Sequence, residues 1–282
     1  MTGQPQDGGL HTRVGVCETV LRMRSFEDDL DAAVEAGVHA IGVSGGDVER
    51  AGIERARQLM RDAGVVASSH MTGGAILDTA APLDTDQDVA LAIEQAALIG
   101  APGVLVRTGP LGDLSIADAD RRCMDWFAAH GPIAAERGVR LMLEPVFPLM
   151  RSFSYVHTLK HALRLLDGAA GTGVCVDLGH LWWDPELLDD LRTNVDRVVT
   201  VQITDVDTSA LAEFRYEREQ LGRGDIPLRH LLGEIEAAGY RGHYEIEILV
   251  RIPRAARVAL VRDARMFLES LDLQSPCSTE NV

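Results

Sequence analysis

The chain has 282 residues, with 43 Asp and Glu against 27 Lys and Arg, a formal net charge of -16 and 46% hydrophobic residues. A hydrophobic content near the globular average excludes a disordered chain, and the acidic surplus would repel a phosphate backbone, so nucleic acid is not an expected partner. The length is more than most single domains have, but it is ordinary for one α/β barrel.

The targeting signals and the cysteines limit the cellular context. The first residues show no basic segment followed by an apolar one, which is the pattern of a secretory signal, and no long apolar run marks a membrane span. The four cysteines lie far apart without a C-x-x-C pair, which argues against a zinc finger or a disulfide framework. We therefore expect a reduced, cytoplasmic protein that does not enter a membrane.

Short apolar or β-branched runs alternate with longer segments of helical period along the whole chain. The expected strands are residues 13–18, 40–44, 65–70, 103–108, 140–146, 173–180, 198–205 and 244–249. The expected helices include residues 26–36, 49–63, 87–99, 116–137, 228–238 and 255–271. Several helices end at a glycine, such as Gly64 or Gly138, which suits a helix C-terminus. Eight β-then-α units predict a (β/α)8 TIM barrel.

The predicted barrel is a single domain over residues 13–272. Residues 1–12 and 273–282 are polar and are expected to form disordered tails. One connection, from Asp205 to the helix that starts near Leu228, is unusually long. It would lie on the C-terminal face of the barrel, where it could cover a site.

Four consecutive predicted strands finish on polar side chains. These residues are Glu144, Asp177, Gln202 and Glu247. The carboxyl ends of barrel strands meet at one face, which is where TIM-barrel enzymes form their active sites. We therefore expect the four side chains to lie together, with polar strand ends bound only by loop amides as the alternative.

The last strand shows which way its side chains point. Tyr244, Ile246 and Ile248 share one face of the strand, and Glu245 and Glu247 share the other. Because the apolar set belongs against the helices, both glutamates are expected inside the barrel.

Converging carboxylates need a counter-charge. Two carboxylates about 4 Å apart repel by about 4 kcal/mol at an effective dielectric of about 20. Three such pairs would rival the net stability of a whole domain. Either a cation or protons taken up at raised pKa must offset this repulsion. The oxygen donors of Glu144, Asp177, Gln202 and Glu247 suit one hard divalent ion, Mn²⁺ or Mg²⁺.

Several motifs resemble the sugar phosphate isomerase/epimerase family of xylose-isomerase-like TIM barrels. The motifs are Leu143-Glu144-Pro145, Asp177-Leu-Gly-His180, Gln202-Ile-Thr-Asp205, Leu221-Gly-Arg-Gly-Asp-Ile and Gly242-His-Tyr-Glu-Ile-Glu247-Ile. The resemblance spans the whole barrel and implies a metal site of Glu144, Asp177, Gln202 and Glu247, with Glu247 rather than Glu245 as the ligand. The epimerases usually have His where this chain has Gln202, and glutamine there is similar to the 3-dehydroshikimate dehydratases.

The resemblance also implies roles for individual residues. Glu144 and Glu247 would be the catalytic acid/base pair. His180 matches a family histidine that contacts substrate oxygens, although it could instead cap the helix that follows. Arg223 matches a family loop near the substrate.

Two further residues are substrate-binding candidates because of their positions alone. His70 closes the third strand and Arg107 closes the fourth, so both could face the barrel mouth. Arg107 would suit an anionic group on the substrate, with a salt bridge to a carboxylate as the alternative.

These features favour a divalent-metal-dependent isomerase or epimerase that transfers protons next to a carbonyl of a sugar, ketose or cyclic polyol ketone. A metal-dependent lyase of the 3-dehydroshikimate dehydratase type is the first alternative, because of Gln202. A non-catalytic ligand-binding barrel is the second. The expected partner is a small carbonyl or polyol substrate, and the resemblance implies a homodimer or homotetramer.

Overall fold

Eight parallel strands close into a barrel in the computed structural model, which describes residues 10–78 and 86–271. The strands are β1 (Val14–Cys17), β2 (Ala40–Ser44), β3 (Val66–Ala75), β4 (Gly103–Arg107), β5 (Arg140–Leu143), β6 (Thr172–Asp177), β7 (Val198–Ile203) and β10 (His243–Ile246). Around the barrel they follow the order β1-β10-β7-β6-β5-β4-β3-β2. The predicted (β/α)8 fold is therefore confirmed.

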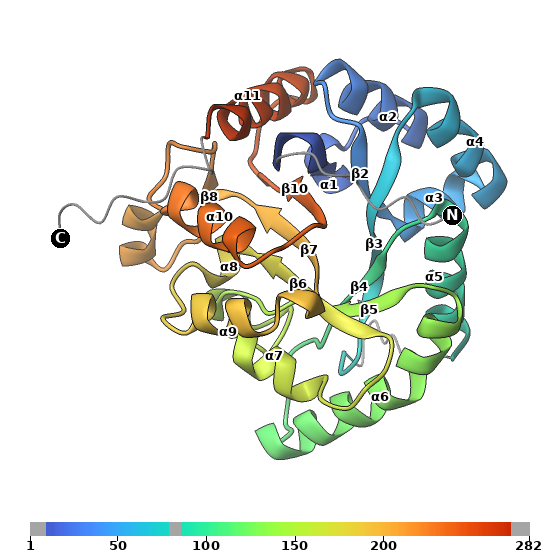
Figure 1. Cartoon of the computed structure of the whole chain (residues 1–282), viewed down its shortest axis with the longest axis vertical. Coiled ribbons are helices and arrows are strands. Elements are labelled where there is room, and N and C mark those ends of the chain that lie inside the picture. Colours follow the sequence, from blue (N-terminus) through green and yellow to red (C-terminus); the bar gives the residue numbers. More distant parts are fainter. Residues whose placement is uncertain (1–9, 79–85, 272–282) are drawn as a thin grey trace.

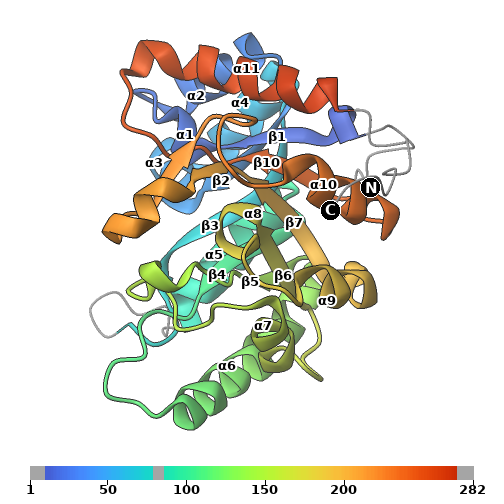
Figure 2. The ribbon, with the colours of Figure 1, turned by 90° about the vertical axis from the view of Figure 1, so that its left-hand side faces the viewer.

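Helices form an outer ring around the strands (Figure 1). They are α1 (Glu18–Leu21), α2 (Phe26–Glu35), α3 (Gly45–Ala51), α4 (Ile53–Ala63), α5 (Asp86–Ile99), α6 (Ile116–Glu136), α7 (Leu159–Leu165), α8 (Leu178–Leu181), α9 (Leu187–Thr193), α10 (Leu228–Ala237) and α11 (Arg257–Ser270). The last helix, α11, packs beside α2, so helices from the early and late parts of the described chain close the ring together (Figures 1 and 2). None of the helices within the described residues is long and apolar enough to cross a membrane.

Two expected boundaries need correction. Residues 49–63 were expected to form one helix, but α3 and α4 are separate because Gly52 between them has a φ of +81°. At the N-terminus, residues 10–12 belong to the 3-10 helix η1 (Leu10–Arg13) rather than to a tail. Buried Arg13 holds η1 in place by donating to the carbonyls of Tyr240 and Gly242. The remaining tail residues, 1–9 and 273–282, lie outside the described residues.

The polar residues expected at strand ends lie at or just beyond them. The sixth strand stops at Asp177 because Oδ1 of that residue accepts a hydrogen bond from the Gly179 amide at 2.8 Å and so caps α8. Glu144 and Glu247 each follow the last residue of their strand. All three carboxylates therefore sit at the C-terminal rim.

A small apolar cluster fills the barrel below that rim. Leu105, Met142, Cys175 and Val199 pack there, separate from the larger core between strands and helices. The barrel is thus a packed interior and not a pore, and the site can form only at its mouth.

The long connection after β7 folds into a hairpin. Strands β8 (Asp205–Asp207) and β9 (Glu217–Glu219) pair antiparallel, with the 3-10 helix η4 (Thr208–Glu213) between them. Asp205 fastens the loop that follows by accepting hydrogen bonds from the amides of Gly222 and Ile226, both at 3.0 Å. Gly224 packs so closely on Asp205 that a Cβ there would lie 2.4 Å from its Oδ1. The hairpin is therefore held at the C-terminal face.

Candidate functional site

Three side chains converge at the C-terminal rim of the barrel with one ligand atom each. These atoms of Glu144, Asp177 and His180 all lie within 4.8 Å of one another. Nε2 of His180 is 3.4 Å from Oδ2 of Asp177 and 4.0 Å from Oε1 of Glu144. All three residues are buried. They form a compact group of one nitrogen and two carboxylates. Glu247 is linked to this group through the side chain of Arg218.

The side chain of Arg218 reaches this group from β9. Its Nη2 donates to Oδ2 of Asp177 at 2.9 Å, and its Nη1 donates to Oε2 of Glu247 at 2.6 Å. Its side chain is only 6% exposed, so the ion pairs are shielded from water. The guanidinium group supplies the positive charge that converging carboxylates require. Sequence reasoning missed Arg218, because the only signal for it was the unusual length of its connection.

Gln202 and Glu245 form a polar layer beneath this group. The Gln202 amide donates to Oε2 of Glu245 at 3.0 Å, and the Ser68 hydroxyl donates to Oε1 at 2.7 Å. Oε1 of Gln202 is buried and has no hydrogen-bond partner among the described residues. In the strand register Gln202 pairs with both Asp177 and Glu245.

Three residues at this rim, Glu144, Asp177 and His180, could hold a metal ion. The carboxylate of Glu247, beside Arg218, and the unpartnered amide oxygen of Gln202 are further candidate oxygen ligands. A buried polar oxygen without a partner is unfavourable unless something binds it. The structure thus brings the four predicted ligands to neighbouring strand ends and adds His180 as a possible nitrogen donor.

Burial and neighbouring charges shift the pKa values of these residues. Burial raises the pKa of Glu144 to about 8, and the nearby charges of Glu247 and Asp177 add to this. Burial also raises the pKa of Glu247. The pKa of His180 falls to about 3, first because of burial and then because of Arg218. His180 is therefore neutral at physiological pH, which is the form that binds metals and accepts hydrogen bonds.

Aromatic side chains form one wall of the site. The rings of Phe147 and Tyr216 stack with centroids 5.0 Å apart, and Trp183 meets Phe147 edge-on at 6.2 Å. Tyr216 also lies 5.7 Å from the His180 ring and donates through its hydroxyl to the Gly179 carbonyl at 2.6 Å. The site therefore has a charged side and an apolar side.

The three remaining predicted residues lie in different places. His70 points away from this group, and its Nε2 is hydrogen-bonded to Gln95 of α5 at 2.9 Å. The reason is that the pairing of β2 with β3 shifts register, which breaks the alternation of side chains along β3. Arg107 is half-buried over the ring of Phe153, and its charge lowers the pKa of Glu144, so it lies near the group. Arg223 is exposed on the loop after β9.

Comparison with known proteins places the fold. Residues 30–271 match the family model of the xylose isomerase-like TIM barrel. A protein of Sinorhizobium meliloti is 25% identical, with a TM-score of 0.80 over 92% of this chain and 98% of that one. No curated protein sequence matches the chain.

Two sugar epimerases share the fold at lower identity. The 3-keto-D-glucoside 4-epimerase of E. coli is 19% identical, with a TM-score of 0.75 over 90% of this chain and 99% of that one. The D-allulose 3-epimerase of Methylomonas is 16% identical, with a TM-score of 0.74 over 92% and 96%. The family match covers most of the barrel, and the chain belongs to the xylose isomerase-like TIM barrel family.

Proposed function

We propose that this protein is a divalent-metal-dependent isomerase or epimerase that transfers a proton next to the carbonyl of a sugar, ketose or cyclic polyol ketone. The observation that carries the proposal is the convergence of Glu144, Asp177, His180 and Glu247 at the mouth of the barrel. Two neighbours of the same fold are named as epimerases of a 3-keto-D-glucoside and of D-allulose, which supports this class of substrate.

Glu144, Asp177, Gln202 and Glu247 would hold Mn²⁺ or Mg²⁺, with His180 as an added donor. An oxygen-rich set favours these hard ions over zinc, which prefers nitrogen and sulfur ligands. A bound ion would supply Lewis-acid stabilisation of the negative charge that develops on the substrate oxygen.

Glu144 and Glu247 would move the proton. They come from β5 and β10, which are separated by β6 and β7 around the barrel, so a substrate between them would meet a carboxyl group on each side. One carboxylate removes the carbon-bound proton, and the other returns a proton to the carbon skeleton. Burial raises the pKa of Glu144 to about 8, so its carboxyl group can hold a proton near neutral pH and return it to the carbon skeleton.

The surrounding side chains orient the substrate. Arg218 lies beside Glu247 and His180 lies beside Glu144, and both side chains can hold substrate oxygens. The stacked rings of Phe147 and Tyr216 offer an apolar face to the C–H face of a sugar and exclude water from that side. Arg107 would suit an anionic substituent. The acidic net charge of -16 also favours a small molecule over a nucleic acid as substrate.

A metal-dependent lyase of the 3-dehydroshikimate dehydratase type is the second candidate. The observation that favours it is Gln202, which stands where the epimerases usually have a histidine ligand. A dehydratase would use the same base to remove a proton, but it would then expel a hydroxyl group from the neighbouring carbon.

Incubation of candidate ketones in heavy water separates the two reactions. An isomerase or epimerase incorporates deuterium into the carbon skeleton, whereas a dehydratase of this type yields a conjugated product that absorbs in the ultraviolet. Glu136→Gln on the exposed end of α6 is the matched control for variants at Glu144 and Glu247. If deuterium enters at the same rate with Glu144→Gln and Glu247→Gln as with the wild type, these residues are not the proton-transfer pair.

A further inference from the structure

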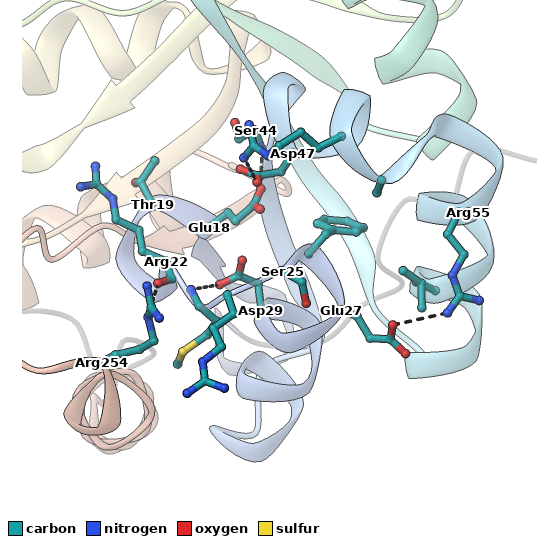
Figure 3. Close-up of a pocket in the computed structure, with 16 residues that line it drawn as sticks. Glu18, Thr19, Arg22, Ser25, Glu27, Asp29, Ser44, Asp47, Arg55 and Arg254 are labelled. Carbon is teal, nitrogen blue, oxygen red and sulfur yellow. Dashed lines mark hydrogen bonds and ion pairs between the residues drawn. The ribbon is translucent and has the colours of Figure 1, made fainter.

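A cavity lies on the flank of the barrel, between the ends of β1 and β2 and the helices that follow them (Figure 3). Its volume is about 550 Å³, within the range that holds a small metabolite. Its lining comes from the β1–α2 segment, the β2–α4 segment and the 3-10 helix η5 (Arg254–Ala256). None of the residues of the carboxylate group at the barrel mouth lines it.

Arginines gather around this cavity although the protein as a whole is acidic. Those that line it are Arg22, Arg24, Arg50, Arg55 and Arg254. Arg50 pairs with Asp47, and Arg55 pairs with Glu27. Arg22, Arg24 and Arg254 make no ion pair within the described part of the chain. The charges of these three guanidinium groups are therefore not neutralised by an ion pair among the described residues.

The positive charges near this cavity also crowd one another. Arg254 donates from Nε to the carbonyl of Arg22 at 2.8 Å, which brings the two residues together (Figure 3). The neighbouring Arg257 has a lowered pKa, first because of burial and then because of repulsion from Arg22 and Arg254. The carboxyl group of Asp29 also lies near Arg254 and Arg257, and it offsets part of this positive charge. The remaining positive charge favours the binding of an anion.

Glu18 adds an independent sign of a ligand. It is 2% exposed and is drawn in the middle of the lining residues in Figure 3. Its Oε2 accepts a hydrogen bond from the Ser44 amide at 2.6 Å, but its buried Oε1 has no hydrogen-bond partner among the described residues. Burial raises the pKa of Glu18 to about 9, and the nearby carboxyl groups of Asp47 and Asp29 add to this shift, so at neutral pH the Glu18 carboxyl is uncharged and does not repel an anion.

We propose that this cavity binds a small polyhydroxylated metabolite that carries a phosphate or carboxylate group. Arg254 binds the oxyanion, because the planar guanidinium fork matches the geometry of both groups, and Arg22 and Arg24 are further basic side chains of the lining that favour an anion. Glu18 donates from its carboxyl to an oxygen of the same ligand, and Asp29, which is buried in the lining, accepts from a hydroxyl. The site is separate from the one proposed for catalysis.

Isothermal titration of the full chain at fixed ionic strength tests this proposal. The probes are D-ribose 5-phosphate, inorganic phosphate and citrate, with D-ribose as the uncharged comparison. We expect a charged probe to bind with one site per chain, and D-ribose to bind at least about tenfold more weakly. Binding of the phosphates but not of citrate identifies the group as a phosphate, and the reverse identifies a carboxylate.

Substitutions of single residues test whether the probes bind in this cavity. We expect Arg22→Gln and Arg254→Gln each to weaken binding about tenfold, and Arg229→Gln on exposed α10 to leave it unchanged. Glu18→Gln keeps a neutral hydrogen-bonding group and should retain binding, whereas Glu18→Leu should lose it. Arg107→Gln, near the barrel mouth, should have no effect. Failure of every charged probe to bind would overturn the proposal. So would binding that depends on Arg107 and not on Arg22 or Arg254.

Discussion

Nη1 of Arg218 lies 2.6 Å from Oε2 of Glu247, and the guanidinium group is almost completely buried. Through its other nitrogen the same side chain binds Asp177, so one cation from the β8–β9 hairpin bridges two of the predicted metal ligands. The long connection after β7 is therefore tied to the site electrostatically as well as by its position. A divalent ion and Arg218 would compensate the same carboxylates.

Replacing Arg218 should destabilise the protein when divalent ions are absent. Arg218→Gln leaves Asp177 and Glu247 as buried carboxylates without a counter-charge, so we expect the free energy of unfolding in EDTA to fall by about 3 to 5 kcal/mol. Added Mn²⁺ should restore more stability to this variant than to the wild type. Denaturant unfolding with and without Mn²⁺ measures both effects.

Arg215→Gln is the matched control for that variant, because Arg215 lies on the same connection but is half-exposed and pairs with Glu213 at the surface. Its unfolding free energy should change by less than about 1 kcal/mol. Equal losses in the two variants would show that the buried bridge has no special role.

The two catalytic glutamates should be needed for turnover but not for folding. Glu144→Gln and Glu247→Gln keep the size of each side chain and remove its capacity to act as a base. We expect each to lower kcat by at least about 100-fold, since general acid–base catalysis contributes about 10² to 10⁴. Circular dichroism should show an intact barrel. Activity within twofold of the wild type in either variant would remove that residue from the mechanism.

Gln202 should set the metal preference. In Gln202→His a nitrogen ligand replaces the amide oxygen, so we expect the affinity for zinc to rise relative to that for Mn²⁺ by about tenfold or more. Titration with each ion measures this ratio. Gln58→His, on the exposed face of α4, introduces a histidine on the outside of the barrel and should leave the ratio unchanged. An unaltered ratio in Gln202→His would mean that this side chain does not bind the ion.

Glu18 should make the stability of the barrel depend on pH. Its pKa is about 9 in the folded protein against an ordinary value of 4.5, so the folded state holds this proton more tightly than the unfolded state does. The resulting stabilisation is complete below pH 4.5 and is lost as the pH rises toward 9. Glu18→Gln has no proton to lose. It should therefore become more stable than the wild type with rising pH, by on the order of 2 to 4 kcal/mol between pH 5 and pH 8.

Glu27→Gln is the control for this pH dependence, because Glu27 lines the same cavity but is exposed and paired with Arg55. Its unfolding free energy should follow that of the wild type at every pH. If Glu18→Gln also follows the wild type, then Glu18 is already ionised in the folded protein at neutral pH.

The sequence predicts the barrel and the rim carboxylates for a simple reason. Alternation along the last strand determines that Glu245 and Glu247 point inward, and the order of strands determines that Glu144, Asp177 and Gln202 lie at neighbouring ends. These relations depend only on local periodicity and on the parallel topology.

Other features depend on contacts that periodicity does not encode. His70 faces α5 because the pairing of β2 with β3 shifts register, and such a shift is not visible in a pattern of apolar residues. Arg218 reaches the site because β9 pairs with β8 and Asp205 fastens the loop. The flank cavity combines residues from α1 through α4 with Arg254, which are far apart in the chain.

Binding of Mn²⁺ to the purified, EDTA-stripped protein tests the central claim most directly. We predict that calorimetric titration gives one ion per chain for the wild type, and that Glu144→Gln and Asp177→Asn each weaken this binding at least about tenfold. The proposed metal centre would be contradicted if the wild type did not bind Mn²⁺, or if both variants bound it with the same affinity as the wild type.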